Sequence, residues 1–165
     1  MAENISYRVF VVSAACLLAV GVAGCGGEEK KTSDVPVVQG IYTTASDCAD
    51  AGHLTYDTCS DLIASAVEAH EKDAPTYTEL RFCEAKEGDG KCEFTANDKI
   101  RPKLLAFLIA TGNPPTSIPL YAHAQGDRGF RDLAGKVYMH ANDKLVFSEH
   151  AVTVFERNAA RQYRR

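Results

Sequence analysis

The sequence lacks tryptophan and every short motif that would mark a common catalytic or nucleotide-binding site. It contains no Gly-x-Ser-x-Gly nucleophile motif, no phosphate-binding loop and no dinucleotide fingerprint. Basic residues are also fewer than acidic ones, so the formal net charge at pH 7 is −4. Such a protein has no general electrostatic attraction to nucleic acid. We therefore expect no catalytic residues, no cofactor and no nucleic-acid partner, and hence not an enzyme.

An apolar run long enough to span a membrane is missing as well. Residues 9–20 are mostly apolar, but a membrane-spanning helix needs about 20 residues, and the run is typical of a secretory signal. Val22-Ala23-Gly24-Cys25 follows and resembles the bacterial lipobox, in which the cysteine thiol receives diacylglycerol. We predict a signal peptide over residues 1–24 and lipid, including palmitate, on Cys25. Cleavage elsewhere and an uncleaved N-terminal anchor are the alternatives.

The segment after Cys25 is polar and rich in small residues, so residues 25–39 are expected to form a flexible tether. Two or more acyl chains would hold the protein stably on a membrane. Residue 26 is Gly rather than Asp, which by the enterobacterial sorting rule favours the outer membrane. The expected location is therefore the bacterial cell envelope, lipid-anchored and facing the periplasm, on the outer rather than the inner membrane.

Cys-x-x-Cys pairs are absent, which argues against a thioredoxin-like site. The mature chain would keep four cysteines: Cys48, Cys59, Cys83 and Cys92. The gaps of ten and eight residues within the first and second pair are too long for a typical zinc cluster, so we expect no metal there. In an oxidising compartment an even count predicts disulfides, although four cysteines allow three pairings.

A short internal repeat favours one of these pairings. Residues 42–48 and 77–83 share the form Tyr-Thr-x4-Cys, and each copy is followed by a second cysteine. Two copies of one unit favour a bridge inside each copy. The predicted disulfides are Cys48–Cys59 and Cys83–Cys92.

Hydrophobic periodicity predicts helices in the first half of the chain. Apolar residues at helical spacing predict a helix capped by Ser60 and ended before Pro75. A second, short helix is expected from Thr78 to Lys86, followed by a turn at residues 88–90. Residues 98–111 are apolar around most of a helix circumference, which predicts a core helix or, alternatively, one that contacts a partner or a membrane surface.

After residues 113–116 the apolar residues recur with a period closer to two, which predicts short antiparallel strands. The expected strands cover residues 120–123, 136–140, 145–147 and 152–155. The predicted fold class is α+β, with one mature domain over residues 40–156. A small disulfide-bridged helical half (40–112) is followed by a short antiparallel β meander (117–156).

Scattered histidines and tyrosines are the remaining candidates for a site. His70-Glu71 begins like a zinc-protease helix, but Ala74 stands where the second histidine belongs. His123, His140 and His150 could meet across neighbouring strands and bind a metal. Four tyrosines could line a glycan surface, although such residues are more often half-buried: Tyr42, Tyr77, Tyr121 and Tyr138.

The C-terminus departs from the mild acidity of the chain. Residues 157–165 form a basic tail with four arginines: Arg157, Arg161, Arg164 and Arg165. On a helix, Arg157, Arg161 and Arg165 would share one face, because they are four residues apart. The plainer expectation is a solvated tail, and the alternative is contact with an anionic envelope surface such as lipid headgroups or cell-wall polymer.

A set of these residues also resembles a known family. The set comprises Tyr42, Cys48, Cys59, Ala66, Ala74-Pro75-x-Tyr77, Cys83-Glu84, Gly88, Gly90 and Cys92, and the likeness returns at residues 119–121 and 130–138. It resembles the YgiB-type family of uncharacterised bacterial lipoproteins (domain-of-unknown-function family 1190). The middle of this chain is shorter than is usual in the family, and the tail is Arg-rich rather than Gly-rich.

The resemblance implies an envelope lipoprotein without assigned activity. The functional hypothesis is a non-enzymatic lipoprotein with a structural or interaction role. Its expected partners are the membrane, through the lipid on Cys25, and another envelope protein or an anionic polymer. The alternative is a periplasm-facing enzyme or metal-binding domain with a His-containing site on the β part.

Overall fold

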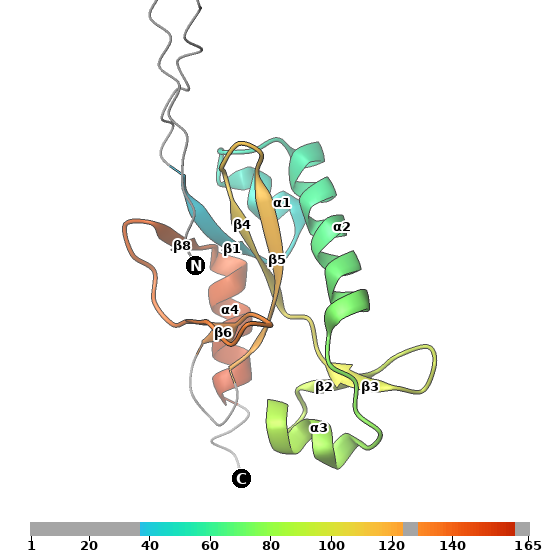
Figure 1. The fold of residues 1–165 in the computed structure, drawn as a ribbon. Coiled ribbons are helices and arrows are strands. Elements are labelled where there is room, and N and C mark those ends of the chain that lie inside the picture. Colours follow the sequence, from blue (N-terminus) through green and yellow to red (C-terminus); the bar gives the residue numbers. More distant parts are fainter. Residues whose placement is uncertain (1–36, 124–128, 161–165) are drawn as a thin grey trace, which may run out of the picture. The chain divides into compact units, whose positions relative to one another are not determined.

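The structure is a computed structural model that describes residues 37–123 and 129–160, with side chains described through Arg157. Its centre is a six-stranded sheet (Figure 1). In spatial order the strands are β7 (Val137–Tyr138), β6 (Phe130–Arg131), β5 (Thr116–Ala122), β4 (Ala106–Ala110), β1 (Gln39–Tyr42) and β8 (Leu145–Phe147). Neighbouring strands are antiparallel except for β1 and β8, which are parallel.

The α+β class is confirmed, but the predicted simple antiparallel meander is wrong. The sheet is mixed and curled, because β1 from the first half of the chain lies between β4 and β8. This strand begins at Gln39, the last residue of the predicted tether. The division into a helical half and a β half therefore does not hold.

The helix predicted over residues 98–111 is also wrong, because this segment contains two strands. These are β3 (Ile100–Pro102) and β4. Alternate residues of β4 face opposite cores: Phe107 and Ile109 join one apolar cluster, whereas Ala106 and Leu108 join another. A strand covered on both faces is apolar throughout, so its periodicity cannot be told from that of a buried helix.

Residues 152–155, predicted as a strand, belong instead to helix α4 (Glu149–Ala160). The β-branched residues Val152, Thr153 and Val154 favoured the strand prediction. Ser148 precedes the helix, and its Oγ accepts a hydrogen bond from the Ala151 backbone N–H at 3.0 Å. The segment is helical despite this strand propensity because one side of the helix packs against the sheet.

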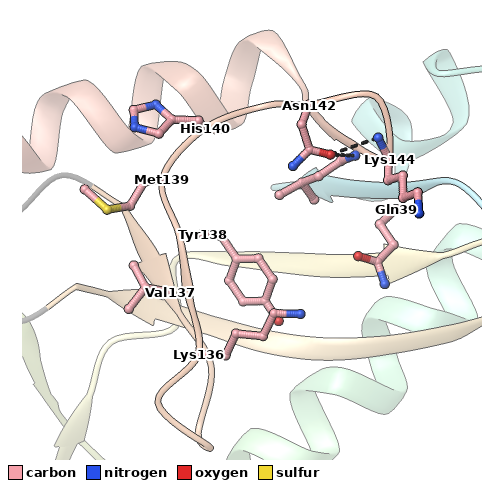
Figure 2. A pocket seen from close by; sticks show the side chains of 9 residues that line it. Gln39, Lys136, Val137, Tyr138, Met139, His140, Asn142 and Lys144 are labelled. Atoms are coloured by element: carbon pink, nitrogen blue, oxygen red, sulfur yellow. Dashed lines mark hydrogen bonds between the residues drawn. The ribbon is translucent and has the colours of Figure 1, made fainter.

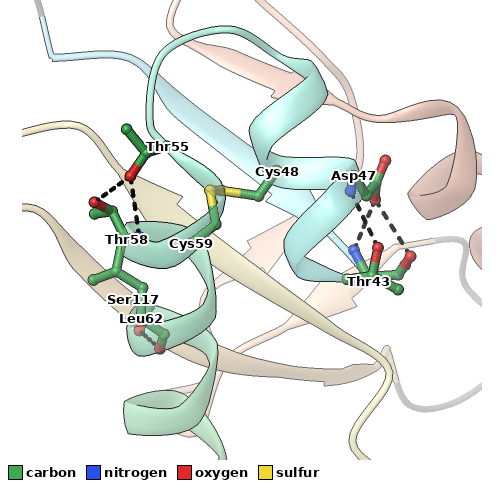
Figure 3. The surroundings of a disulfide bond; sticks show 9 residues. Thr43, Asp47, Cys48, Thr55, Thr58, Cys59, Leu62 and Ser117 are labelled. Atoms are coloured by element: carbon green, nitrogen blue, oxygen red, sulfur yellow. Dashed lines mark hydrogen bonds between the residues drawn. A yellow bond between two sulfur atoms is a disulfide. The ribbon is translucent and has the colours of Figure 1, made fainter.

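Two helices cover the opposite face of the sheet from α4. They are α1 (Ala45–Asp50) and α2 (Tyr56–Asp73), and α2 lies along β5 (Figure 1). The cap of α2 is Thr55 rather than the predicted Ser60, since Thr55 Oγ1 accepts from the Thr58 backbone N–H. The helix ends at Asp73, and its C-cap Ala74 stands before Pro75, as predicted. The Cys48–Cys59 disulfide joins α1 to α2 (Figure 3).

A smaller unit follows α2 in the chain. It consists of α3 (Leu80–Glu87) and the hairpin of β2 (Cys92–Phe94) with β3. The short helix is confirmed, although its N-cap is Glu79 rather than Thr78. Gly88 and Gly90 have positive φ angles in the expected turn. The Cys83–Cys92 disulfide closes this unit, so both bridges pair as the repeat predicts.

Candidate functional site

A buried histidine joins the long helix to the sheet. His70 lies near the end of α2 and is 2% exposed. Its Nδ1 lies 3.0 Å from Tyr121 Oη, and its Nε2 lies 3.5 Å from Glu93 Oε1. Burial, followed by the positive charge of Arg101, lowers the pKa of His70, so the imidazole is neutral at neutral pH. Burial also raises the pKa of Tyr121 to about 12.

An arginine on the small hairpin completes this arrangement. Arg101 Nη1 and Nη2 each lie 2.7 Å from a Glu71 carboxylate oxygen, and Nε lies 2.9 Å from Glu93 Oε1. The hydrogen bond from Arg101 lowers the pKa of Glu71. Glu93 and Arg101 are cross-strand partners in the β2–β3 register. The arginine thus ties the hairpin to α2, and we call these five residues the His70 network: His70, Glu71, Glu93, Arg101 and Tyr121.

A second polar group also reaches Tyr121, through Arg131. Glu87, the last residue of α3, is 2% exposed. Its Oε1 accepts a hydrogen bond from Tyr77 Oη at 2.6 Å, and its Oε2 forms an ion pair with Arg131. The Arg131 guanidinium carbon lies 5.7 Å from the centroid of the Tyr121 ring. The two groups therefore meet at Tyr121, where α2, α3 and the sheet come together.

This geometry accounts for the His70-Glu71 pair that begins like a zinc-protease motif. His70 is directed at Tyr121 and Glu93, while Glu71 is occupied by Arg101. Each ionisable group has a partner on a different element. Among the described residues His70 Nδ1 has a hydrogen-bond partner, whereas the buried Nε2 has none and only lies near Glu93. The hydrogen bonds and ion pairs that are formed stabilise the relative placement of the elements that carry them.

Asp47, Ser148 and His150 form a second cluster that contains the residue types of a serine-hydrolase triad. In such a triad the histidine lies between acid and nucleophile, where it can remove the serine proton. Here the acid lies in the middle: Asp47 Oδ2 accepts from Ser148 Oγ at 2.6 Å, and Asp47 Oδ1 lies 3.4 Å from His150 Nδ1. The Thr43 backbone N–H also donates to this carboxylate (Figure 3). The cluster therefore joins the starts of α1 and α4, and the serine hydroxyl donates to the carboxylate rather than to the histidine.

An open cavity of about 280 Å³ lies beside the two edge strands of the main sheet (Figure 2). Residues 136–140, around β7, form one wall, and Asn142, Lys144, Leu145 and Gln39 form the other. The described residues that line it include two lysines and no carboxylate. Sequence analysis did not find this site, because its two walls are brought together only by the curl of the sheet.

The other predicted site residues are not brought together. Within residues 37–123 and 129–160, no three His, Cys, Asp or Glu side chains are grouped so that they could hold a metal ion. His123, His140 and His150 thus form no such group. Three of the four tyrosines are buried rather than arranged on an open surface: Tyr42, Tyr121 and Tyr138.

The predicted anchor and most of the basic tail lie outside the described residues. These are Cys25, Arg161, Arg164 and Arg165. Arg157 is described, and it is exposed near the end of α4. None of the helices in the described part of the chain is both long and apolar enough to cross a membrane.

Together these features define a disulfide-bridged α+β domain built on a mixed six-stranded sheet. Disulfides of this kind indicate a non-cytoplasmic location. The chain belongs to the family described as "Protein of unknown function (DUF1190)", which matches residues 37–162 and so confirms the family expected from the sequence. The comparisons with curated proteins and with solved structures found no match.

Proposed function

We propose that this protein is a bacterial envelope lipoprotein that acts by contact with a partner rather than by catalysis. The proposed anchor is lipid on Cys25, with residues 1–24 removed as a signal peptide. The proposed location is the periplasmic side of the outer membrane. The lipobox-like residues 22–25 and the two disulfides support this proposal.

One observation carries the non-catalytic role: the buried polar side chains are bonded to other parts of the fold. His70, Asp47 and Glu87 are the groups most suited to acid–base chemistry by their burial. Each of them has hydrogen-bond or ionic partners on other elements of the fold. Such groups support a rigid scaffold, and a scaffold on a lipid tether is suited to binding at a membrane.

Fractionation of cells that produce Cys25→Ser tests the anchor. The variant should lack lipid. It should either leave the membrane fraction after cleavage at another position, or stay there with its uncleaved leader and a mass above that of the mature wild type. If the variant still fractionates with membranes and has the mature mass of the wild type, the anchor proposal is wrong.

Photocrosslinking in intact cells tests the contact role. A photoreactive residue would replace Phe82, Phe94 or Met139, which are exposed apolar side chains. We expect a discrete adduct from at least one position, and we expect it to disappear when Cys25→Ser is added, because the tether places the domain. An adduct that is unchanged by Cys25→Ser, or no adduct at any position, would contradict a tethered contact role.

A further inference from the structure

The open cavity beside β7 and β8 has the character of an anion-binding site. Figure 2 shows the side chains of Lys136, Tyr138 and Gln39 around one space, with Asn142 and Lys144 at its upper border. The cavity volume of about 280 Å³ lies near the lower limit of small-molecule pockets, which is about 300 Å³. A ligand that fits must therefore be small.

Among the residues that the structure describes, no carboxylate lines the cavity and balances its positive charge. Within the described part of the chain, neither Lys136 nor Lys144 has a carboxylate within ion-pair distance. Lys136 Nζ instead lies 5.1 Å from the centroid of the Tyr138 ring. This contact holds the ammonium group at the wall of the cavity and leaves it able to donate.

Asn142 adds a donor with a defined orientation. Its Oδ1 accepts hydrogen bonds from the backbone N–H groups of Lys144 and Leu145, at 2.9 and 3.1 Å. The acceptor side of the amide is thus occupied by the turn, and the Nδ2 group remains as donor. In Figure 2 this nitrogen points away from the turn and toward the open space.

The buried acid Asp132, which is bonded to the wall that carries Lys136, is turned to other partners. Asp132 Oδ1 accepts from the Lys136 backbone N–H at 2.9 Å, and Oδ2 accepts from Tyr138 Oη at 3.0 Å. The carboxylate is 7% exposed and fixes the ends of the loop that carries Lys136. Its hydrogen bonds orient the wall without placing an acceptor in the cavity.

We propose that this cavity binds the anionic group of a small ligand, a phosphate or a carboxylate, between Lys136 and Lys144. The two ammonium groups supply charge, and the Asn142 amide supplies a directed hydrogen bond. Tyr138 and Leu145 also line the cavity, but their side chains belong to the core, so the contacts to the anionic group come from the exposed Lys136, Asn142 and Lys144. The proposal stands independently of the lipid anchor.

The test is a titration of the full chain, in a non-ionic detergent, with inorganic phosphate at constant ionic strength. Backbone and Asn142 side-chain NMR signals report binding residue by residue. We expect saturable shifts for residues 136–145 and Gln39. The double variant Lys136→Gln/Lys144→Gln should weaken binding at least about tenfold, the effect of losing roughly one charged hydrogen bond. Lys99→Gln, an exposed lysine in the β2–β3 hairpin, is the matched control and should bind as the wild type does.

Acetate in place of phosphate distinguishes the two anionic groups, and the one with the lower dissociation constant identifies the ligand chemistry. Equal shifts with chloride would show screening alone and would overturn the proposal. Unchanged affinity in a double variant that keeps the wild-type circular dichroism spectrum would overturn it as well.

Discussion

His70 and Tyr121 are 51 positions apart in the sequence, yet imidazole Nδ1 and phenol Oη lie 3.0 Å apart inside the domain. This contact joins the end of α2 to the end of β5, and both side chains are almost completely buried. Each ring supplies the polar partner that the other would otherwise lack. The consequences of this relationship for stability can be measured directly.

The first prediction concerns acid stability. The pKa of His70 is lower in the folded protein than its usual value near 6.5, chiefly because of burial. Below about pH 6.5 the unfolded chain therefore binds more protons, and the free energy of unfolding falls as the pH falls. The loss stops growing once the pH is below the folded pKa. Urea unfolding between about pH 7 and pH 5 measures this slope.

Two variants attribute the slope to this residue. His70→Gln keeps a polar side chain but cannot titrate, so its stability should depend less on pH over this range. His53→Gln, at an exposed position before α2, is the control and should keep the wild-type slope. An equal slope in wild type and His70→Gln would show that other groups cause the pH dependence.

The second prediction concerns the hydroxyl of Tyr121. Tyr121→Phe keeps the ring under Arg131 and removes the only hydrogen-bond partner within 3.0 Å of His70 Nδ1 that the structure describes. Leaving a buried polar atom unsatisfied costs about 1–3 kcal/mol, so the free energy of unfolding should fall by that amount. Tyr56→Phe, on an exposed tyrosine, should change it by less than about 0.5 kcal/mol. Equal stability of the two variants would contradict a role for this hydrogen bond.

The third prediction concerns the two disulfides. Each closes a loop of similar length, with sequence separations of 11 and 9. In the chain-entropy model each bridge contributes about 2–3 kcal/mol, so Cys48→Ala/Cys59→Ala and Cys83→Ala/Cys92→Ala should be destabilised comparably. Peptide mapping without reduction should recover the same two pairs. A crossed pair such as Cys48–Cys83 would contradict both the repeat argument and the fold.

The disulfide pairing could be predicted because it depends on local repetition, whereas the sheet order could not. The parallel pairing of β1 with β8 joins residues about a hundred positions apart, such as Gln39 and Leu145, and no local pattern encodes it. The helix prediction for the segment around Leu108 was wrong for another reason. Burial on both faces removes the alternation of apolar and polar residues that marks a strand.

The candidate sites show the same division between local and long-range information. Residue types and spacing predicted the cysteine pairs, because that signal lies within short segments. Cys25 was indicated in the same way and stays a prediction. The ion pair of Glu87 with Arg131 and the contact of His70 with Tyr121 depend on how distant elements pack. The lysines of the cavity border turns and, in the sequence alone, look like ordinary solvated charges.

The last prediction concerns the basic tail. Arg157 is exposed near the end of α4, and Arg161, Arg164 and Arg165 follow it in the sequence. If the tail docks on an anionic surface, each arginine near that surface contributes about 1 kcal/mol to the free energy of binding. Salt screens this attraction, over a Debye length of about 8 Å at physiological ionic strength. A chain that starts at residue 26 removes any contribution from lipid or leader. Its binding to anionic vesicles should be measurable at low salt and should fall as salt is added.

The matched variant replaces all four arginines with glutamine and keeps the chain length. It should bind anionic vesicles more weakly than the wild type, while neither chain should bind neutral vesicles. The variant Lys136→Gln/Lys144→Gln separates the tail from the cavity, because it alters the proposed anion site and leaves the arginines in place. If the four-arginine variant binds as tightly as the wild type, or if neither binds at low salt, the tail is a solvated terminus and the orientation of the domain is set elsewhere.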